Sequence, residues 1–220
     1  KRIYLVFFMA ISFALVSCSG GGSNESESDS SEMTTEEETS MTEEENDAPF
    51  GDVSGTYVLN AAESTMGWSG SKPLGEHNGT INISEGNIMF EDGTISGGEF
   101  TFDMTSIIDL DLEDEEKNAK LVGHLKSDDF FNVAEHPTAN FKILEMMEDE
   151  EGNNIIRGEL TIKQITKVIK FPAEVNVDGD MMTAKANFEI DRTKWNVRYG
   201  SKTFFDDLGD KFINDEIGIT

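Results

Sequence analysis

A histidine and two aspartates stand close together in the segment GHLKSDDFF, residues 123–131. The side chains of His124, Asp128 and Asp129 could transfer protons or bind a metal ion. Phe130 and Phe131 follow directly, and phenylalanine rings commonly pack against other apolar groups. The segment is therefore either a catalytic or metal-binding group or the edge of an apolar pocket, and the rest of the chain has to decide between the two.

The rest of the chain supplies no further motif for catalysis or metal binding. Its three histidines, His77, His124 and His136, are not spaced as two ligands on one helix or strand face. Residues 113–117, EDEEK, lack the glycine and the alternating acids of an EF-hand. The sequence also lacks a serine nucleophile elbow, a Walker loop and the dinucleotide-binding glycine pattern. We therefore expect no catalytic residue, no metal, no cofactor and no enzymatic activity.

The charge of the chain excludes some classes of partner. Its 220 residues include 17 Lys and Arg against 44 Asp and Glu, which gives a formal net charge of -27. Nucleic acids are bound through basic surfaces that neutralise phosphates, so we expect no nucleic-acid partner. Electrostatic adhesion to an anionic membrane is disfavoured for the same reason.

The first residues have the pattern of a targeting segment. Lys1 and Arg2 precede an apolar stretch, residues 3–16, that is too short to span a bilayer comfortably. Ser17 then precedes Cys18, the only cysteine, so no intramolecular disulfide can form. This arrangement resembles the bacterial lipobox, which implies a signal peptide over residues 1–17 and a lipid anchor on Cys18. The alternative is an ordinary signal peptide with an incidental cysteine.

Residues 18–50 are predicted to be a disordered acidic linker. No Lys or Arg occurs between Cys18 and Lys72, and Gly, Ser, Thr and acidic residues dominate the first part of this stretch. Too few apolar residues are present to offset the entropy of ordering, and the like charges repel one another. We expect a tether that holds a domain away from a membrane, although a sorting signal is an alternative. The expected location is the cell envelope, with the protein anchored by lipid to the outer membrane on its periplasmic or surface face.

Residues 51–220 are predicted to fold as one all-β domain. Apolar and polar residues alternate in segments such as 156–163 (IRGELTIK) and 182–190 (MTAKANFEI), and alternation with period two is typical of half-buried strands. Short turn signals separate these segments, for example 84–87 (SEGN) and 178–180 (DGD). Strands that follow one another with such short connections favour an antiparallel sheet.

The sheet has to close on itself or stack on a second sheet, and a closed barrel would also remove its vulnerable edges. Eight to ten candidate strands are present, but only residues 113–131 have the pattern of a helix, and one helix cannot cover a whole sheet. We therefore predict an antiparallel barrel of about eight strands with one or two short helices, whose interior is either filled or holds a small ligand. Pro172 is expected at an edge, bulge or bend, because proline cannot donate to a ladder.

The apolar face of each predicted strand gives the expected lining of the barrel. Phe130 and Phe131 are expected to close one end of the lumen, by core packing or by contact with a ligand. Alternation alone does not distinguish a hollow lumen from a solid core. The complete predicted set is Phe100, Phe102, Met104, Phe130, Phe131, Phe141, Ile143, Leu160, Ile162, Phe171, Val175 and Phe188.

Five segments carry short motifs in a particular order. They are residues 123–133 (GHLKSDDFFNV), 136–141 (HPTANF), 158–162 (GELTI), 166–169 (TKVI) and 191–197 (DRTKWNV). Together they resemble the YceI-like family of bacterial polyisoprenoid-binding proteins. The first two are similar to the family's HL-x-S-x-x-FF motif and the Pro-Thr pair and Phe that follow it, and the other three resemble later motifs in the family's order. The resemblance extends over nearly all of residues 51–220.

The resemblance implies an extended, lipocalin-like barrel that encloses an elongated amphiphile and catalyses no reaction. The ligand would be an isoprenoid quinone, a polyprenyl chain or a fatty chain, and His124 would contact its head group or fix the neighbouring helix by hydrogen bonding. The partners would be this lipid and, through the anchor, a membrane; a homodimer is left open. Two alternatives are a solid-core protein-interaction or stress module without a ligand and, less favoured, a barrel enzyme for a small hydrophobic substrate.

Three further expectations concern single residues and the last strand. Ser127 is expected to be the N-cap of a helix, with Asp128 and Asp129 in its first turn. Arg192 is expected to contact the ring of Trp195 or to pair with a carboxylate. Residues 213–219 (INDEIGI) are expected to form the last strand, with the acidic residue at 215 near a rim.

Overall fold

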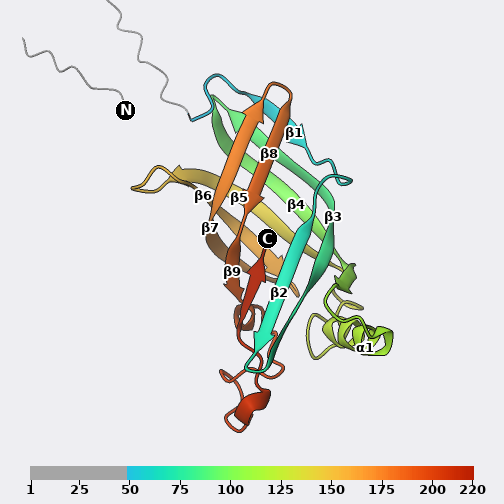
Figure 1. Cartoon of the computed structure of the whole chain (residues 1–220). Coiled ribbons are helices and arrows are strands. Elements are labelled where there is room, and N and C mark those ends of the chain that lie inside the picture. The colour runs from blue at the N-terminus through green and yellow to red at the C-terminus, as the bar shows by residue number, and fades with distance from the viewer. Residues whose placement is uncertain (1–48) are drawn as a thin grey trace, which may run out of the picture. The chain divides into compact units, whose positions relative to one another are not determined.

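The computed structural model of the chain describes residues 49–220 (Figure 1). The predicted signal peptide, the lipidation at Cys18 and all but the end of the acidic linker lie outside the described residues. Within residues 49–220, no helix combines the length and the apolar character needed to cross a membrane.

Ten strands form the domain, together with one α-helix and two short 3-10 helices. The strands are β1 (Gly55–Val58), β2 (Met66–Lys72), β3 (Gly75–Glu91), β4 (Thr94–Asp109), β5 (Thr138–Glu148), β6 (Asn154–Ile162), β7 (Ile165–Asp178), β8 (Met181–Ala186), β9 (Phe188–Asp191) and β10 (Glu216–Ile219). The helices are α1 (Glu115–Lys126), η1 (Arg192–Trp195) and η2 (Gly209–Lys211).

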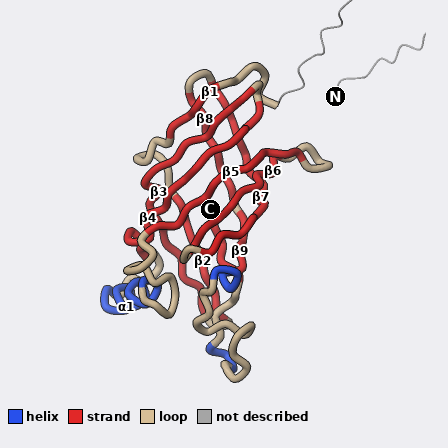
Figure 2. Tube along the Cα trace, turned by 180° about the vertical axis from the view of Figure 1, so that it is seen from behind, coloured by secondary structure: helices blue, strands red, loops and turns tan. Residues whose placement is uncertain are grey.

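The strands form a nearly closed antiparallel barrel (Figures 1 and 2). Their order is β8-β7-β6-β5-β4-β3-β2-β10-β9, and β1 pairs with β3 beside β2. The strands at the two ends of this order, β8 and β9, are consecutive in the chain and are separated only by Asn187. At Asn187 the chain therefore passes from β8, which pairs with β7, to β9, which pairs with β10. This passage closes one half of the barrel. The predicted fold class is confirmed.

The other half of the barrel has a lateral seam. Within residues 49–220, β8 pairs with β7 alone, so the facing edges of β8 and of β1 have no ladder between them. One hydrogen bond bridges them at the end of the barrel, where the hydroxyl of Tyr57 in β1 donates to the carbonyl of Gly179 in the β7–β8 turn at 3.0 Å.

Two features of the long strands follow from local chemistry. Lys163 and Gln164 form the two-residue turn between β6 and β7 with φ of 50° and 60°, as a type I′ hairpin turn requires. Pro172 lies where β7 changes partner, because its pairing with β6 ends at Ile155–Pro172 and its pairing with β8 begins at Ala173–Ala186. This agrees with the expected bend.

The predicted turn at residues 84–87 is wrong. β3 continues through this segment from Gly75 to Glu91 and absorbs a register shift between Ile83 and Glu85. Gly86 packs beneath the ring of Phe100 across the ladder, where an added Cβ would lie 2.4 Å from Cδ1 of the ring. The glycine therefore makes room for a ring and does not reverse the chain.

The predicted cap at Ser127 is also wrong. The helix α1 begins after Asp114, whose side chain accepts a hydrogen bond from the N–H of Lys117 at 3.0 Å. Ser127 instead ends α1, and its hydroxyl donates to the carbonyl of His124 at 2.7 Å. The helix therefore stops at Lys126, and the two phenylalanines that follow lie in the turns after it.

The last strand is shorter than expected, since β10 contains only Glu216–Ile219. The guanidinium of Arg192 donates to the carbonyls of Ile213 and Asn214, at 3.1 Å and 3.0 Å. These carbonyls therefore bind a side chain in place of a neighbouring strand, which explains why the ladder begins only after Asp215.

Candidate ligand-binding cavity

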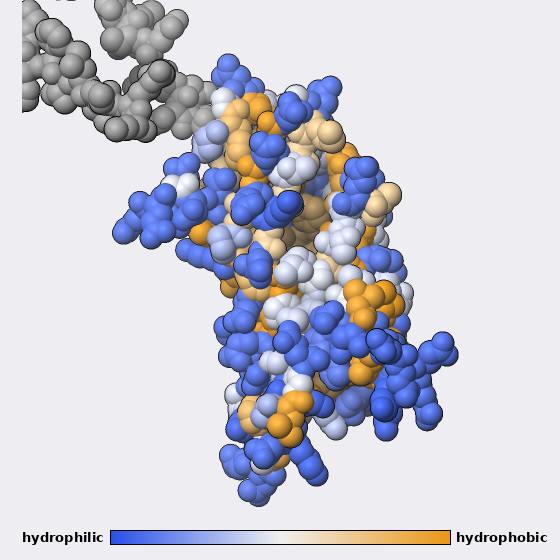
Figure 3. Space-filling model, viewed as in Figure 1, coloured by the Kyte–Doolittle hydropathy of each residue, from blue (hydrophilic) through white to orange (hydrophobic). Residues whose placement is uncertain are grey.

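The barrel encloses a cavity of about 880 Å³. This volume lies in the range of roughly 300–1,000 Å³ that is usual for small-molecule sites. The wall is formed by inward side chains of the strands and by residues from the α1 region and the C-terminal loop. Figure 3 shows apolar side chains within a hollow that is bordered by polar and charged ones.

All twelve residues of the predicted lining border this cavity. Seven of them are only half-buried although they point inward, because the space in front of them is open: Phe100, Phe102, Phe131, Ile162, Phe171, Val175 and Phe188. The lumen is therefore hollow, and the solid core that alternation left open is not what the barrel contains.

Aromatic rings form one side of the wall. The ring of Phe171 in β7 stacks on that of Phe188 in β9, with centroids 4.1 Å apart and an interplanar angle of 7°. The ring centroids of Phe141 in β5 and Phe171 are 5.4 Å apart, and the ring of Phe141 lies over Gly158 of β6. These rings pack laterally against one another and present apolar surface to the lumen.

The polar side chains of the lining gather mainly at the end of the barrel near α1. They include Lys72, His77, His124, Tyr199, Lys211 and Asn214. Among the described residues that line the cavity, none is Asp or Glu, although the chain as a whole is strongly acidic. We call this end the mouth of the cavity and define it by the six residues named above.

The histidine of the opening segment lies in the mouth. His124 Nε2 is 3.3 Å from an oxygen of Asp129, and its ring meets those of Phe130 and Tyr199 edge-on at 5.0 Å and 4.5 Å. Asp128 is exposed and does not line the cavity. The structure thus brings together one histidine and one aspartate of the predicted trio, inside an aromatic cluster.

A lysine holds the turns around Phe130 in place. Lys163 reaches from the β6–β7 turn and donates to the carbonyls of Phe130 and Asn196, at 2.9 Å and 3.2 Å. Burial lowers the pKa of Lys163, the charge of Arg198 lowers it further, and Asp128 opposes them. The backbone at Phe130 is therefore fixed by a side chain from the turn between β6 and β7.

Arg192 is a buried structural centre beside the mouth, with only 2% of its surface exposed. It donates to the carbonyl of Val197 at 2.8 Å and pairs with Asp215 at 3.3 Å, in addition to its bonds to the carbonyls before β10. Burial lowers the pKa of Arg192, and the charge of Asp215 opposes this change. The predicted pairing with a carboxylate is confirmed.

The aromatic partner of Arg192 differs from the one that the sequence suggested. The guanidinium carbon lies 5.9 Å from the ring centre of Phe130. Trp195 is instead buried in the core, and its indole N–H donates to the carbonyl of Leu160 at 3.0 Å. The short spacing between Arg192 and Trp195 does not bring their side chains face to face, because η1 and its hydrogen bonds turn them to different partners.

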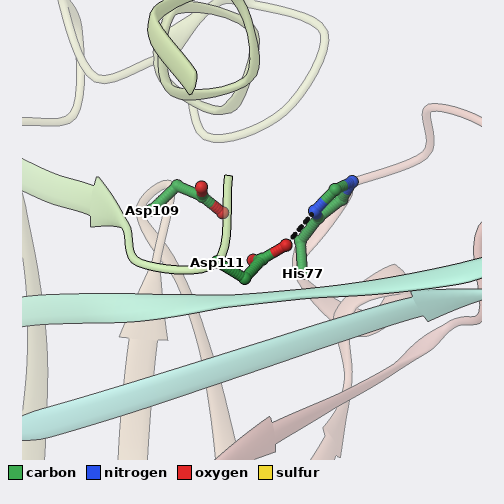
Figure 4. Close-up of side chains that lie close together, drawn as sticks. All are labelled: His77, Asp109 and Asp111. Carbon is green, nitrogen blue, oxygen red and sulfur yellow. Dashed lines mark hydrogen bonds and ion pairs between the residues drawn. The ribbon is translucent and has the colours of Figure 1, made fainter. Parts of the chain in front are cut away.

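His77 of the mouth also belongs to a cluster with Asp109 and Asp111 that was not predicted from the sequence (Figure 4). Nδ1 of His77 is 2.9 Å from an oxygen of Asp111. Burial raises the pKa of Asp109, and the nearby Asp111 raises it further. Burial also acts upward on the pKa of Asp111, but hydrogen bonds from the N–H of Asn78 and from His77 outweigh it and lower the value. The three residues are far apart in sequence except for the Asp-x-Asp pair, so no local pattern could have revealed them.

The barrel and its cavity define a class of small β-barrel binding domains, and sequence comparison gives the family. Residues 57–220 match the YceI-like domain, and the chain belongs to this family. It is 30% identical over 103 residues to a UPF0312 protein of Pectobacterium carotovorum, a match that covers 46% of this chain and 50% of that protein. A UPF0312 protein of Pseudomonas aeruginosa is 28% identical over 103 residues, with the same coverage. The chain spans about half the length of the curated relatives it matches.

Two solved structures are similar in fold. BcnA of Burkholderia cenocepacia has a TM-score of 0.57 and 22% identity, over 73% of this chain and 95% of that one. A polyisoprenoid-binding domain from Saccharophagus degradans, implicated in plant cell wall breakdown, has a TM-score of 0.52 and 12% identity, over 76% and 95%. At these identities the two structures show a shared fold.

Proposed function

We propose that the protein binds an elongated amphiphilic lipid, with the hydrocarbon chain inside the barrel and the polar head at the mouth. The observation that carries this proposal is a cavity of about 880 Å³ with an apolar interior and polar side chains gathered mainly at one end. The polyisoprenoid-binding domain of similar fold supports an isoprenoid quinone or a polyprenyl chain as ligand, and a fatty chain has the same shape and polarity.

Hydrophobic burial alone provides enough free energy for such binding. Each methylene transferred from water contributes about 0.8 kcal/mol, so ten buried methylenes contribute roughly 8 kcal/mol before the costs of association. The ligand therefore needs few specific polar contacts, and its chain would be shielded from water while it is away from a bilayer.

Binding without catalysis is the function that the lining favours. A barrel enzyme would need titratable groups that converge inside the lumen with shifted pKa values. Arg192, the buried basic residue of the lining, is occupied by three backbone carbonyls and Asp215. No carboxylate of the described residues is available in the lining as a general base.

We also propose that the barrel acts as a tethered carrier or reservoir in the cell envelope. This part rests on the sequence: the lipobox-like segment before Cys18 and the acidic residues that follow it. A lipid on Cys18 and an extended linker would let the barrel reach a membrane surface while it stays attached.

Quenching of tryptophan fluorescence by an isoprenoid quinone tests the proposed binding. Trp68 lines the cavity, whereas Trp195 is buried in the core and does not border it. Delipidated protein should show saturable quenching with one quinone per chain, and the Trp68→Phe variant should lose most of the quenching. Saturation should also displace a fluorescent fatty acid. Absence of saturable quenching together with absence of fatty-acid binding would reject the proposal.

A further inference from the structure

We propose that His77, Asp109 and Asp111 form a binding site for a zinc ion, which the spacing of the histidines did not predict. One potential ligand atom from each residue lies within 4.8 Å of the other two (Figure 4). The residues come from three places, since His77 is in β3, Asp109 ends β4, and Asp111 lies in the connection to α1. The proposal does not rest on lipid binding, although His77 also lines the mouth of the cavity.

The two carboxylates are held in place by donors on their outer oxygens. Oδ1 of Asp109 accepts hydrogen bonds from the N–H of Leu112 at 2.9 Å and from the amide of Asn118 in α1 at 3.1 Å. Oδ1 of Asp111 accepts from the N–H of Asn78 at 2.8 Å. Of the two other oxygens, Oδ2 of Asp111 lies 2.9 Å from Nδ1 of His77, a contact that an ion between them would replace, and Oδ2 of Asp109 is left for a further partner.

One of these remaining oxygens is buried without a partner. Asp109 is only 5% exposed, and among the described residues its Oδ2 is the buried side-chain atom that lacks a hydrogen bond. A buried polar atom without a partner costs about 1–3 kcal/mol, and more when it is charged. Figure 4 shows the carboxylate of Asp109 directed toward Asp111 and His77, so a cation among the three residues would satisfy it.

The ligand set fits zinc better than magnesium or calcium. Magnesium and calcium prefer ligand sets made only of oxygen, whereas zinc binds imidazole nitrogen and carboxylate oxygen at about 2.0–2.2 Å. Three protein ligands leave a fourth position for water. The side chains of His77 and Asp111 are 28% and 26% exposed, so an ion can reach the site from solvent.

The competing explanation is a proton on Asp109 that is shared with Asp111, and the Asp109→Asn variant separates the two. An asparagine amide can donate to Asp111 as a protonated carboxyl would, so it preserves the structure but removes a charged ligand. The experiment is isothermal titration of the full chain with zinc chloride, repeated with the Asp109→Asn, His77→Gln and His136→Gln variants. His136 contacts Gln164 and lies outside the cluster, which makes it the matched control.

We expect one zinc ion per chain for the wild type and for His136→Gln. At a zinc concentration 100 times the dissociation constant, the melting temperature should rise by roughly 5–10 °C. Asp109→Asn and His77→Gln should each weaken zinc binding at least tenfold while circular dichroism shows the folded barrel. Crystals soaked in zinc should give an anomalous peak between the three side chains.

Several results would overturn the site. These are no zinc binding by the wild type, unchanged binding by both variants of the cluster, or an equal effect of magnesium at the same concentration. Unchanged zinc binding by Asp109→Asn alone would assign the free oxygen of Asp109 to a shared proton, and this result also rejects the proposal.

Discussion

The ring of Phe100 lies against Gly86 directly across the β3–β4 ladder, so closely that a Cβ on the glycine would be 2.4 Å from Cδ1 of the ring. Every close neighbour of that position is a side-chain atom, from Phe100 or from Leu59. Phe100 also lines the cavity. The width of the lumen at this level therefore depends on the absence of a side chain at residue 86.

The Gly86→Ala variant should narrow the lumen. The new methyl group has to displace the ring of Phe100, and such overpacking costs about 1–3 kcal/mol of stability. We expect weaker quinone binding in fluorescence titrations and a lower unfolding midpoint in urea. Gly123→Ala is the control, because nothing lies within 4 Å of that position in α1, and it should leave quinone binding unchanged. Equal affinities for wild type and Gly86→Ala would show that Phe100 does not limit the lumen.

A large side chain placed inside the barrel should block binding. Ala173 of β7 lines the cavity, and Glu174 is on the outer face of the same strand. Ala173→Phe should reduce the affinity for a long-chain lipid at least tenfold, because the new ring occupies lumen volume. Glu174→Phe adds the same group outside and should bind normally. Similar affinities for both variants would place the ligand somewhere other than the lumen.

His124 is the residue predicted to contact the head group. Replacement by alanine should lower the affinity for a quinone several-fold while a fatty alcohol of similar length, which has a smaller head, is affected less. His136→Ala is the control, since that histidine does not border the cavity. If His124→Ala lowers only the unfolding midpoint and leaves both affinities unchanged, the histidine serves the packing of Phe130 and Tyr199 alone.

Arg192 should contribute more to stability than its partner Asp215 does. Arg192→Met leaves three backbone carbonyls without their donor and Asp215 without its cation, a loss of about 3–5 kcal/mol. Asp215→Asn keeps the carbonyl bonds and should cost about 1–2 kcal/mol. Urea unfolding of both variants measures the difference. An equal loss would mean that the ion pair, and not the set of carbonyls, is the main contribution.

The lateral seam should affect the rate at which ligand is exchanged. Tyr57→Phe removes the hydrogen bond to the carbonyl of Gly179 across the seam. A single hydrogen bond contributes about 0.5–1.5 kcal/mol, so we expect the dissociation rate of a fluorescent fatty acid to rise several-fold in stopped-flow measurements. An unchanged rate would indicate that the ligand leaves through the mouth.

Strand alternation was enough to predict an antiparallel all-β domain and the side chains that face its interior. In β7, for example, the alternation that runs through Phe171 and Val175 placed these residues on the inner face, where the structure has them. Successive side chains of a strand point to opposite faces, so burial of one face appears in the sequence as an alternation of apolar and polar residues. Whether the interior is hollow depends on how opposite walls meet, and single strands carry no information about that.

The errors came from residues whose role is set by distant neighbours. Gly86 suggested a turn, but a glycine is needed there because the ring of Phe100 on the next strand occupies the space of a side chain. Ser127 can cap either end of a helix, and only the competing cap at Asp114 shows which end it occupies. The cluster around His77 depends on the register between β3 and β4, which brings residues about thirty positions apart into contact. Each of these features needs the tertiary fold before it can be recognised.

Native mass spectrometry of the purified chain, before and after solvent extraction, tests the central claim most directly. We predict that untreated protein carries an added mass that extraction removes, that the extract contains one lipid chain per protein, and that adding this lipid back restores the mass. A single unliganded mass before extraction, together with no uptake of isoprenoid or fatty lipids afterwards, would contradict it.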